Sequence, residues 1–232
     1  MKMPHDPAGV TVGTWTTPQS LIADLSQVAW EDWFARHWVD DHNHDWQWII
    51  DHSVRSNTFR AFHHMPERPS VVFRAWAYKA IDNGALDRVC SIKSRNEYDQ
   101  WFQELGEGLR RFWVRRMGTE RPMRFGQSMK LTGLVMKGVC CSPSLPRAVF
   151  DRLVWFVHVP LDAFAISAVR CYGPGSGFTQ RLGSIPRSAA MGYVKTLQTY
   201  EAFQDCIRHA AKKAGVPPIA FDILAWDDAH ER

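Results

Sequence analysis

Several features that define other protein classes are missing from this 232-residue sequence. It has no apolar run that approaches the roughly 18 residues of a membrane-spanning helix, and residues 1–13 lack the charged-then-apolar pattern of a signal peptide. Internal repeats and low-complexity segments are missing, and the period-2 alternation that indicates strands is scarce. These absences argue against a membrane protein, a repeat protein and a β-sheet protein.

Cysteine is present without an ordered pattern. The five cysteines have no spacing typical of a disulfide framework or an iron–sulfur cluster: Cys90, Cys140, Cys141, Cys171 and Cys206. Residues 173–177 are rich in glycine, but the Lys and Ser or Thr of a phosphate-binding loop do not follow them. The His- and Asp-rich stretch 37–64 matches no standard zinc pattern. We therefore expect reduced thiols in a soluble, cytoplasmic protein with no metal and no cofactor.

The charge of the chain is more informative in its distribution than in its sum. Hydrophobic residues make up 45% and charged residues 22%, which is the ordinary balance of a globular protein, and the formal net charge is +4. Arginine is concentrated in one short region: Arg110, Arg111, Arg115, Arg116, Arg121 and Arg124. A local basic stripe on a near-neutral protein suits a polyanion held on one face, although a solvated helix face has the same pattern.

The spacing of apolar residues predicts an all-α fold. Residues 1–13, with two prolines and two glycines, read as a loose arm, and residues 171–187, with four glycines and two prolines, read as a loop. Residues 14–232 are expected to form one domain of two helical lobes, about 14–120 and 121–232, with a cleft between them. Helices are expected from Thr17, within 30–52, and over about 71–81, 96–117, 127–141, 145–158, from Asp162, 196–214 and 217–226.

Two lysines lie in the otherwise apolar stretch from Phe125 to Lys137. Lys130 and Lys137 are seven residues apart, so they fall within roughly 20° of the same helix face. Gly133, one turn from Lys130, leaves room on that face for a close approach. A lysine that is partly desolvated, or close to another cation, is a competent amine nucleophile. Both lysines could equally extend along the edge of a core helix.

Asp162 is the second candidate for chemistry. It follows Pro160 by two residues and precedes an apolar helix, so it lies where an N-cap is expected. The helix dipole and the backbone donors of the first turn stabilise a carboxylate in this place. Capping alone would explain the residue. A fixed carboxylate is also what a reaction that develops positive charge on a sugar requires.

A lysine helix followed by a Val-Pro-x-Asp helix start resembles the helix-hairpin-helix DNA glycosylase superfamily. More narrowly, Met129-Lys130-Leu131 and Val135-Met136-Lys137 are similar to the Gln-Lys-Thr and Val-Lys-Met motifs of the archaeal-type 8-oxoguanine DNA glycosylases. The spacing from Lys130 to Asp162 agrees with that subfamily. Phe221–Trp226 resembles its pocket motif, in which an Asp and a Trp stand one turn apart.

The resemblance covers about residues 125–170 and 196–228, and the sequence departs from the family in two places. The usual Leu-Pro-Gly-x-Gly hairpin is reduced to Phe125-Gly126-Gln127, and residues 1–95 do not align with the archaeal enzymes. In the family the front half supplies part of the base pocket, so the sequence departs from the family where the base is contacted.

The resemblance implies a role for each matching residue. Lys130 would attack C1′ of a nucleotide flipped out of double-stranded DNA, and Asp162 would stabilise the charged sugar and help to deprotonate the lysine. The base would be contacted by Lys137, by Asp222 as an acceptor and by Trp226 as a stacking surface. Gly126 and Gln127 would contact the DNA backbone. A monomeric enzyme without metal or cofactor is implied.

The choice of substrate remains open at this point. The divergent front half, rich in Trp and His, indicates a rebuilt pocket, and we expect excision of a hypermodified phage base such as glucosylated hydroxymethylcytosine, in defence against phage. Repair of 8-oxoguanine, with or without a lyase step, is the alternative within the same class. A non-catalytic DNA-binding module is an alternative from another class. A small helical RNase would need an Arg-x4-His motif, of which the sequence has no convincing instance.

Overall fold

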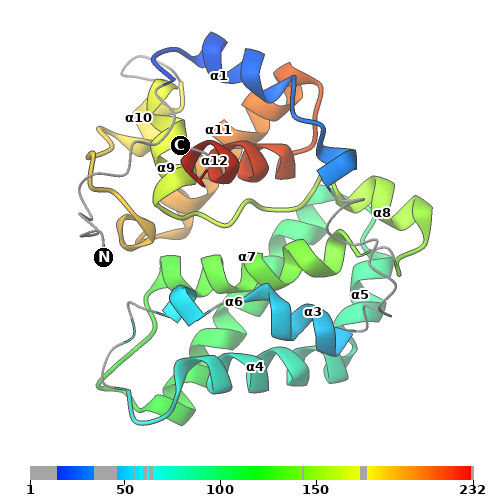
Figure 1. Ribbon diagram of the computed structural model, residues 1–232. Coiled ribbons are helices and arrows are strands. Elements are labelled where there is room, and N and C mark those ends of the chain that lie inside the picture. Colours follow the sequence, from blue (N-terminus) through cyan, green and yellow to red (C-terminus); the bar gives the residue numbers. More distant parts are fainter. Residues whose placement is uncertain are drawn as a thin grey trace, which may run out of the picture. The chain divides into compact units, whose positions relative to one another are not determined.

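The computed structural model describes residues 15–33, 46–54, 56–59, 62, 65–142, 144–172 and 177–230 (Figure 1). All regular elements in these ranges are helical, which confirms the predicted all-α class. The predicted arm, residues 1–13, lies outside the described residues. Within the described ranges, none of the helices combines the length and the apolar character needed to cross a membrane.

The chain divides into two compact units. Unit 1 comprises residues 1–30 and 161–232, and unit 2 comprises residues 31–160. The sequence suggested a division near residue 120, but the helices on either side of that point pack against each other in unit 2. The first helix of the chain packs against helices near the C-terminus in unit 1, so unit 1 is built from two segments distant in sequence.

Unit 2 contains α3 (Trp46–Ser53), η1 (Ser56–Phe59), α4 (Pro69–Ala80), η2 (Ile81–Ala85), α5 (Leu86–Ser91), α6 (Arg95–Met117), α7 (Phe125–Cys140) and α8 (Arg147–Leu153). Helix α7 packs against α6 and α3, and α4 packs against α3 and α6 (Figure 1). Helix α8 ends at Leu153, before the expected end near His158, and residues 154–162 form an irregular connector.

Helix α6 shows why the sequence forms these elements. The Ser94 side chain caps it by accepting a hydrogen bond from the Glu97 amide, and Gly118, at φ 85°, ends it. Among the apolar residues that recur at helical spacing along α6, Trp101, Leu109 and Trp113 are buried, whereas Leu105 and Phe112 are half-buried. The helix is therefore amphipathic. Its buried face is narrower than the face that its apolar residues span, because two of them are half-buried.

A glycine sets the close approach of α6 to α7. A Cβ atom built on Gly106 would lie 2.6 Å from Sδ of Met129 and 3.8 Å from Oγ1 of Thr132. Any side chain at this position would require Met129 to move. The absence of a side chain at Gly106 therefore lets the thioether of Met129 on α7 pack directly against α6.

Trp113 ties the end of α6 to the segment that leads into α7. Its side chain is fully buried, its ring centroid lies 5.0 Å from that of Phe62, and its indole N–H donates to the carbonyl of Arg121 at 3.2 Å. The link 118–124, which carries two of the clustered arginines, is thereby held to the core of unit 2.

Unit 1 contains α1 (Pro18–Leu25), α9 (Ala163–Val169), η3 (Arg170–Tyr172), α10 (Thr179–Leu182), η4 (Met191–Tyr193), α11 (Leu197–Ala214) and α12 (Ile219–His230). The predicted helix start at Thr17 is confirmed, and the Thr17 side chain caps α1 by accepting from the Ser20 amide. The loop expected over residues 171–187 includes the short helix α10, which packs against α11. Helices α1 and α9 each pack against both α11 and α12.

Candidate active site

Helix α7 is buried on every face except one. The partly exposed positions after its first residue are Gln127, Lys130, Leu134 and Lys137, which recur at intervals of three and four residues. The remaining positions from Gly126 to Cys140 are buried. The two lysines therefore share one half-exposed stripe, as their spacing predicts.

Lys137 makes an aromatic contact that the sequence motifs did not indicate. Its Nζ lies 4.9 Å from the ring centroid of Trp33, a residue of unit 2. An ammonium group over an indole face is a favourable cation–π arrangement. The pair places a hydrogen-bond donor and an aromatic surface on the same side of α7 as Lys130.

The room beside Gly133 is filled by another part of the chain. A Cβ atom built on Gly133 would lie 3.5 Å from Cγ of Pro160, which is an ordinary van der Waals distance. The close approach expected at this glycine is made by the proline of the connector. Pro160 is the last residue of unit 2.

A buried histidine anchors the same connector. His158 is 5% exposed, and its Nε2 lies 2.7 Å from Oδ1 of Asp99 on α6. Asp99 also accepts from Nε of Arg95 at 3.3 Å, and the imidazole meets the Phe102 ring edge-on at 4.6 Å between centroids. The connector is therefore fixed to α6 by His158 and to α7 by Pro160. Sequence reasoning missed this anchor, because Asp99 and His158 lie 59 residues apart.

Asp162 is held at both of its carboxylate oxygens. As predicted it caps α9, and its Oδ1 accepts from the amides of Phe164 at 2.9 Å and Ala165 at 3.0 Å. Its Oδ2 accepts from the indole N–H of Trp226 at 3.0 Å. Three N–H donors therefore complement the negative charge of this half-buried side chain.

The C-terminal helix α12 contributes two of the predicted site residues. Asp222 is 5% exposed, so its carboxylate is not a solvated surface group. Trp226, one turn later, is 38% exposed. The Trp226 ring stands edge-on to Phe164, with centroids 6.1 Å apart. Residue Trp226 was expected as a stacking surface alone, and the structure adds its hydrogen bond to Asp162.

The clustered arginines lie at the end of α6 and on the link to α7, and all six are exposed. Two of them form ion pairs: Nε of Arg116 lies 3.0 Å from Glu67, and Arg111 lies 3.7 Å from Glu107. At the start of α7 the Gln127 side-chain carbonyl accepts from the Arg124 amide at 2.9 Å, and Gly126 is buried. Gln127 therefore caps the helix, which leaves its amide N–H₂ as the group for any DNA contact.

The environment of the thiols can be described for three of the cysteines. Burial raises the pKa of Cys171 to about 12 and holds the pKa values of Cys140 and Cys206 above their usual range, so these thiols are neutral at physiological pH. Among the described residues, no cluster of three or more His, Cys, Asp and Glu side chains could hold a metal ion. Much of the His- and Asp-rich stretch lies outside those residues.

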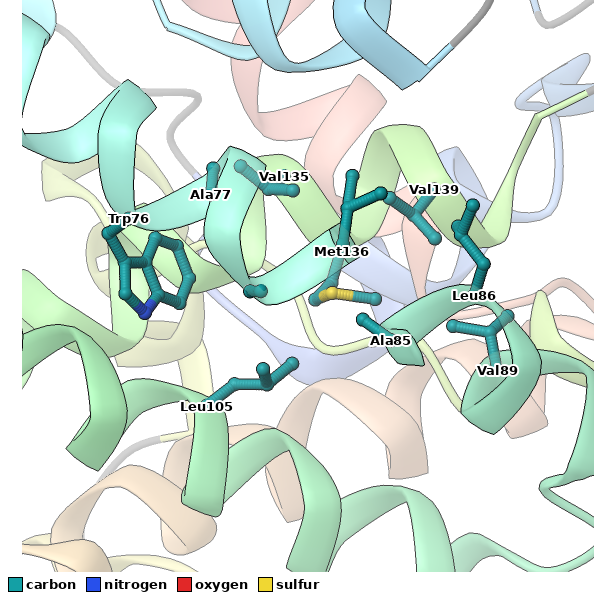
Figure 2. Close-up of a pocket in the computed structure, with 11 residues that line it drawn as sticks. Trp76, Ala77, Ala85, Leu86, Val89, Leu105, Val135, Met136 and Val139 are labelled. Carbon is teal, nitrogen blue, oxygen red and sulfur yellow. The ribbon is translucent and has the colours of Figure 1, made fainter. Parts of the chain in front are cut away.

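A small apolar pocket in unit 2 is distinct from the lysine stripe. Figure 2 shows it between α4, η2, α5, α6 and α7, with Val135, Met136 and Val139 as the lining residues from α7. These three lie on the face of α7 opposite Lys130. Its volume of about 10 Å³ admits about one water molecule, which is far too small for a base.

The predicted site residues fall into two groups by unit. Lys130 and Lys137 lie on α7 of unit 2, whereas Asp162, Asp222 and Trp226 belong to unit 1, where Asp162 and Trp226 are in direct contact. No protein-family model, curated protein or solved structure matches the chain. Function is therefore inferred from the residues and their local geometry.

Proposed function

We propose that the protein is a DNA glycosylase, which flips a modified base out of double-stranded DNA and cleaves its N-glycosidic bond to leave an abasic site. We propose that it acts as a cytoplasmic monomer without metal or cofactor. The observation that carries the proposal is the placement of Lys130 on the one half-exposed stripe of an otherwise buried helix. A lysine in such a place is desolvated in part and accessible in part, as an amine nucleophile must be.

The path of the chain supports a partnership between Lys130 and Asp162. Pro160 contacts Gly133, which is one turn from Lys130 on α7, and Asp162 follows Pro160 by two residues. We propose that the amine of Lys130 and the carboxylate of Asp162 act on the same extruded nucleotide. This convergence is part of the proposal, since the two residues belong to different units.

The proposed chemistry uses these two groups in sequence. The Nζ lone pair of Lys130 forms a bond to C1′, while the bond from C1′ to the base breaks and the base leaves with the electron pair of that bond and takes up a proton. The carboxylate of Asp162 stabilises the positive charge that develops on the sugar and accepts a proton from the attacking amine. At this stage the nitrogen is bonded to C1′ of a closed sugar ring. The C1′–O4′ bond then breaks as the nitrogen lone pair forms a C1′=N bond, and O4′ takes up the proton that Asp162 holds. Water adds to C1′ of this protonated imine and the C1′–N bond breaks, which releases the aldehyde form of the abasic sugar and returns the lysine as its ammonium.

For the substrate we propose a hypermodified cytosine that carries a glucosyl-hydroxymethyl group, excised from phage DNA in defence. Trp33 and Lys137 support this choice, because an indole face and an ammonium donor beside Lys130 suit a bulky substituent rich in hydroxyl groups. In the same assignment Asp222 and the face of Trp226 contact the base, while Gly126 and Gln127 contact the DNA backbone. Excision of 8-oxoguanine is the alternative substrate.

The test is a comparison of four duplexes of one sequence, which contain glucosylated hydroxymethylcytosine, hydroxymethylcytosine, 8-oxoguanine or no modification. Abasic sites are counted with an aldehyde-reactive probe after incubation with the protein. We expect abasic sites in the glucosylated duplex alone. Abasic sites confined to the 8-oxoguanine duplex would transfer the assignment to repair, and binding of DNA without base release from any duplex would contradict a glycosylase.

The exposed arginines favour a second candidate, a non-catalytic DNA-binding module, and they also give a prediction that both candidates share. We expect Arg115→Gln and Arg124→Gln each to weaken DNA binding and to lower the slope of log K against log salt by about 0.9, because each removes one contact to a phosphate. Binding is measured by fluorescence anisotropy over a salt series.

Arg147→Gln is the matched control, because this exposed arginine lies on α8 and pairs with Asp151. It should leave the salt slope unchanged. If the three variants have the same slope as the unmodified protein, the arginine cluster is a solvated surface and does not contact DNA.

A further inference from the structure

The two oxygens of Asp162 are held in different ways. Oδ1 accepts two hydrogen bonds from backbone amides of α9, so it is part of the helix cap. Oδ2 accepts from the Trp226 side chain at 3.0 Å. The amides of α9 and the indole N–H therefore hold different oxygens, and together they set the orientation of the carboxylate.

The position of Trp226 is itself well defined. Its helix, α12, packs against α9, and the preceding residues Phe221, Ile223 and Ala225 are buried. The edge-on contact with Phe164, in the first turn of α9, keeps the indole beside the cap that Asp162 forms. The N–H edge of Trp226 is thus used inside unit 1, while the side chain remains 38% exposed.

We infer that Trp226 is a positioning residue for the carboxylate of Asp162, and this inference rests on the proposed function. Its indole N–H holds Oδ2 in the orientation in which the negative charge faces the developing positive charge of the sugar. A carboxylate fixed by three donors does not have to reorganise during the reaction, and preorganised charge of this kind lowers the barrier. Stacking on the exposed ring is a separate property of the same side chain.

Substitution by Phe and by Leu separates the two properties. Trp226→Phe keeps an aromatic face and removes the N–H, so we expect kcat for base release to fall about 10- to 150-fold, the effect of losing a hydrogen bond to a charged group, while KM changes little. Trp226→Leu removes both, and it should show the same fall in kcat together with a raised KM. Both constants are obtained from steady-state release of base from the glucosylated duplex.

Trp155→Phe is the matched control, since Trp155 is 44% exposed and belongs to unit 2. We expect it to have unchanged kcat and KM. If Trp226→Phe retains the unmodified kcat, or if it raises KM alone, the positioning role is overturned and stacking is the function of the residue.

A spectroscopic measurement tests the hydrogen bond without DNA or activity. In protein labelled with 15N-tryptophan, the indole resonance of Trp226 is assigned by its loss in Trp226→Phe. We expect Asp162→Ala to shift this resonance upfield and to speed the exchange of its proton with solvent, while the Trp155 indole is unaffected. An unchanged Trp226 indole would overturn the inference.

These outcomes separate the inference from the proposed function. If no duplex loses a base, or if Lys130→Gln retains full turnover, the proposed function fails even when the indole resonance responds to Asp162→Ala. If Lys130→Gln is inactive while Trp226→Phe is fully active, the proposed function stands and the positioning role of Trp226 fails.

Discussion

Replacement of Lys130 by Gln is expected to lower the rate of base release by on the order of 10³-fold or more, because it removes the nucleophile and leaves a side chain of similar length. DNA binding should persist, since the arginine cluster is unchanged. The rate is measured by single-turnover release of base, and binding by anisotropy on the same duplex. Borohydride should link the unmodified protein to DNA through the imine, whereas the Lys130→Gln variant should form no adduct.

Lys137→Gln is the control for this experiment, because both lysines lie on the same stripe of α7 and Lys137 contacts Trp33. We expect it to weaken substrate binding and still to form the borohydride adduct. Wild-type turnover by Lys130→Gln would show that Lys130 is not the nucleophile. Base release by the unmodified protein without any trapped adduct would indicate a glycosylase that activates water instead.

The largest expected effect on stability is that of Trp113→Ala. The side chain is fully buried against Phe62 and donates to the Arg121 carbonyl, so its removal should lower the free energy of unfolding by about 3–5 kcal/mol. Trp113→Phe retains much of the buried ring and should cost about 1–3 kcal/mol, from the lost hydrogen bond and the smaller volume. Urea denaturation followed by circular dichroism measures both changes.

Phe112→Ala is the comparison for the Trp113 variants. This neighbouring aromatic residue is half-buried, and we expect the Ala substitution to cost less than Trp113→Ala. Equal losses at positions 112 and 113 would contradict the placement of Trp113 at the centre of the unit 2 core.

The local parts of this structure could be predicted from the sequence. Thr17 and Asp162 cap their helices as their polar side chains before apolar runs indicate, and the spacing of Lys130 and Lys137 places them on one face of α7. These features depend on residues a few positions apart. Helical periodicity and capping chemistry are therefore sufficient to find them.

The features that depend on distant parts of the chain could not be predicted. The hydrogen bond between Trp226 and Asp162 joins residues 64 apart, and the contact between His158 and Asp99 joins residues 59 apart. The sequence indicated room for a close approach at Gly133, but it could not indicate that Pro160 makes this approach. The division into units has the same origin, because the pairing of α1 with α11 leaves no signal in the spacing of apolar residues.

The burial of α7 has a consequence for how this gene can change over time. Mutation at the enclosed positions of the helix would disturb the packing of unit 2, so those positions have little freedom to vary. The positions where drift would cost least in stability are Gln127, Lys130, Leu134 and Lys137, and these include the two lysines that the proposed chemistry needs. Retention of lysine at 130 among descendants of this gene is what selection for the proposed activity predicts.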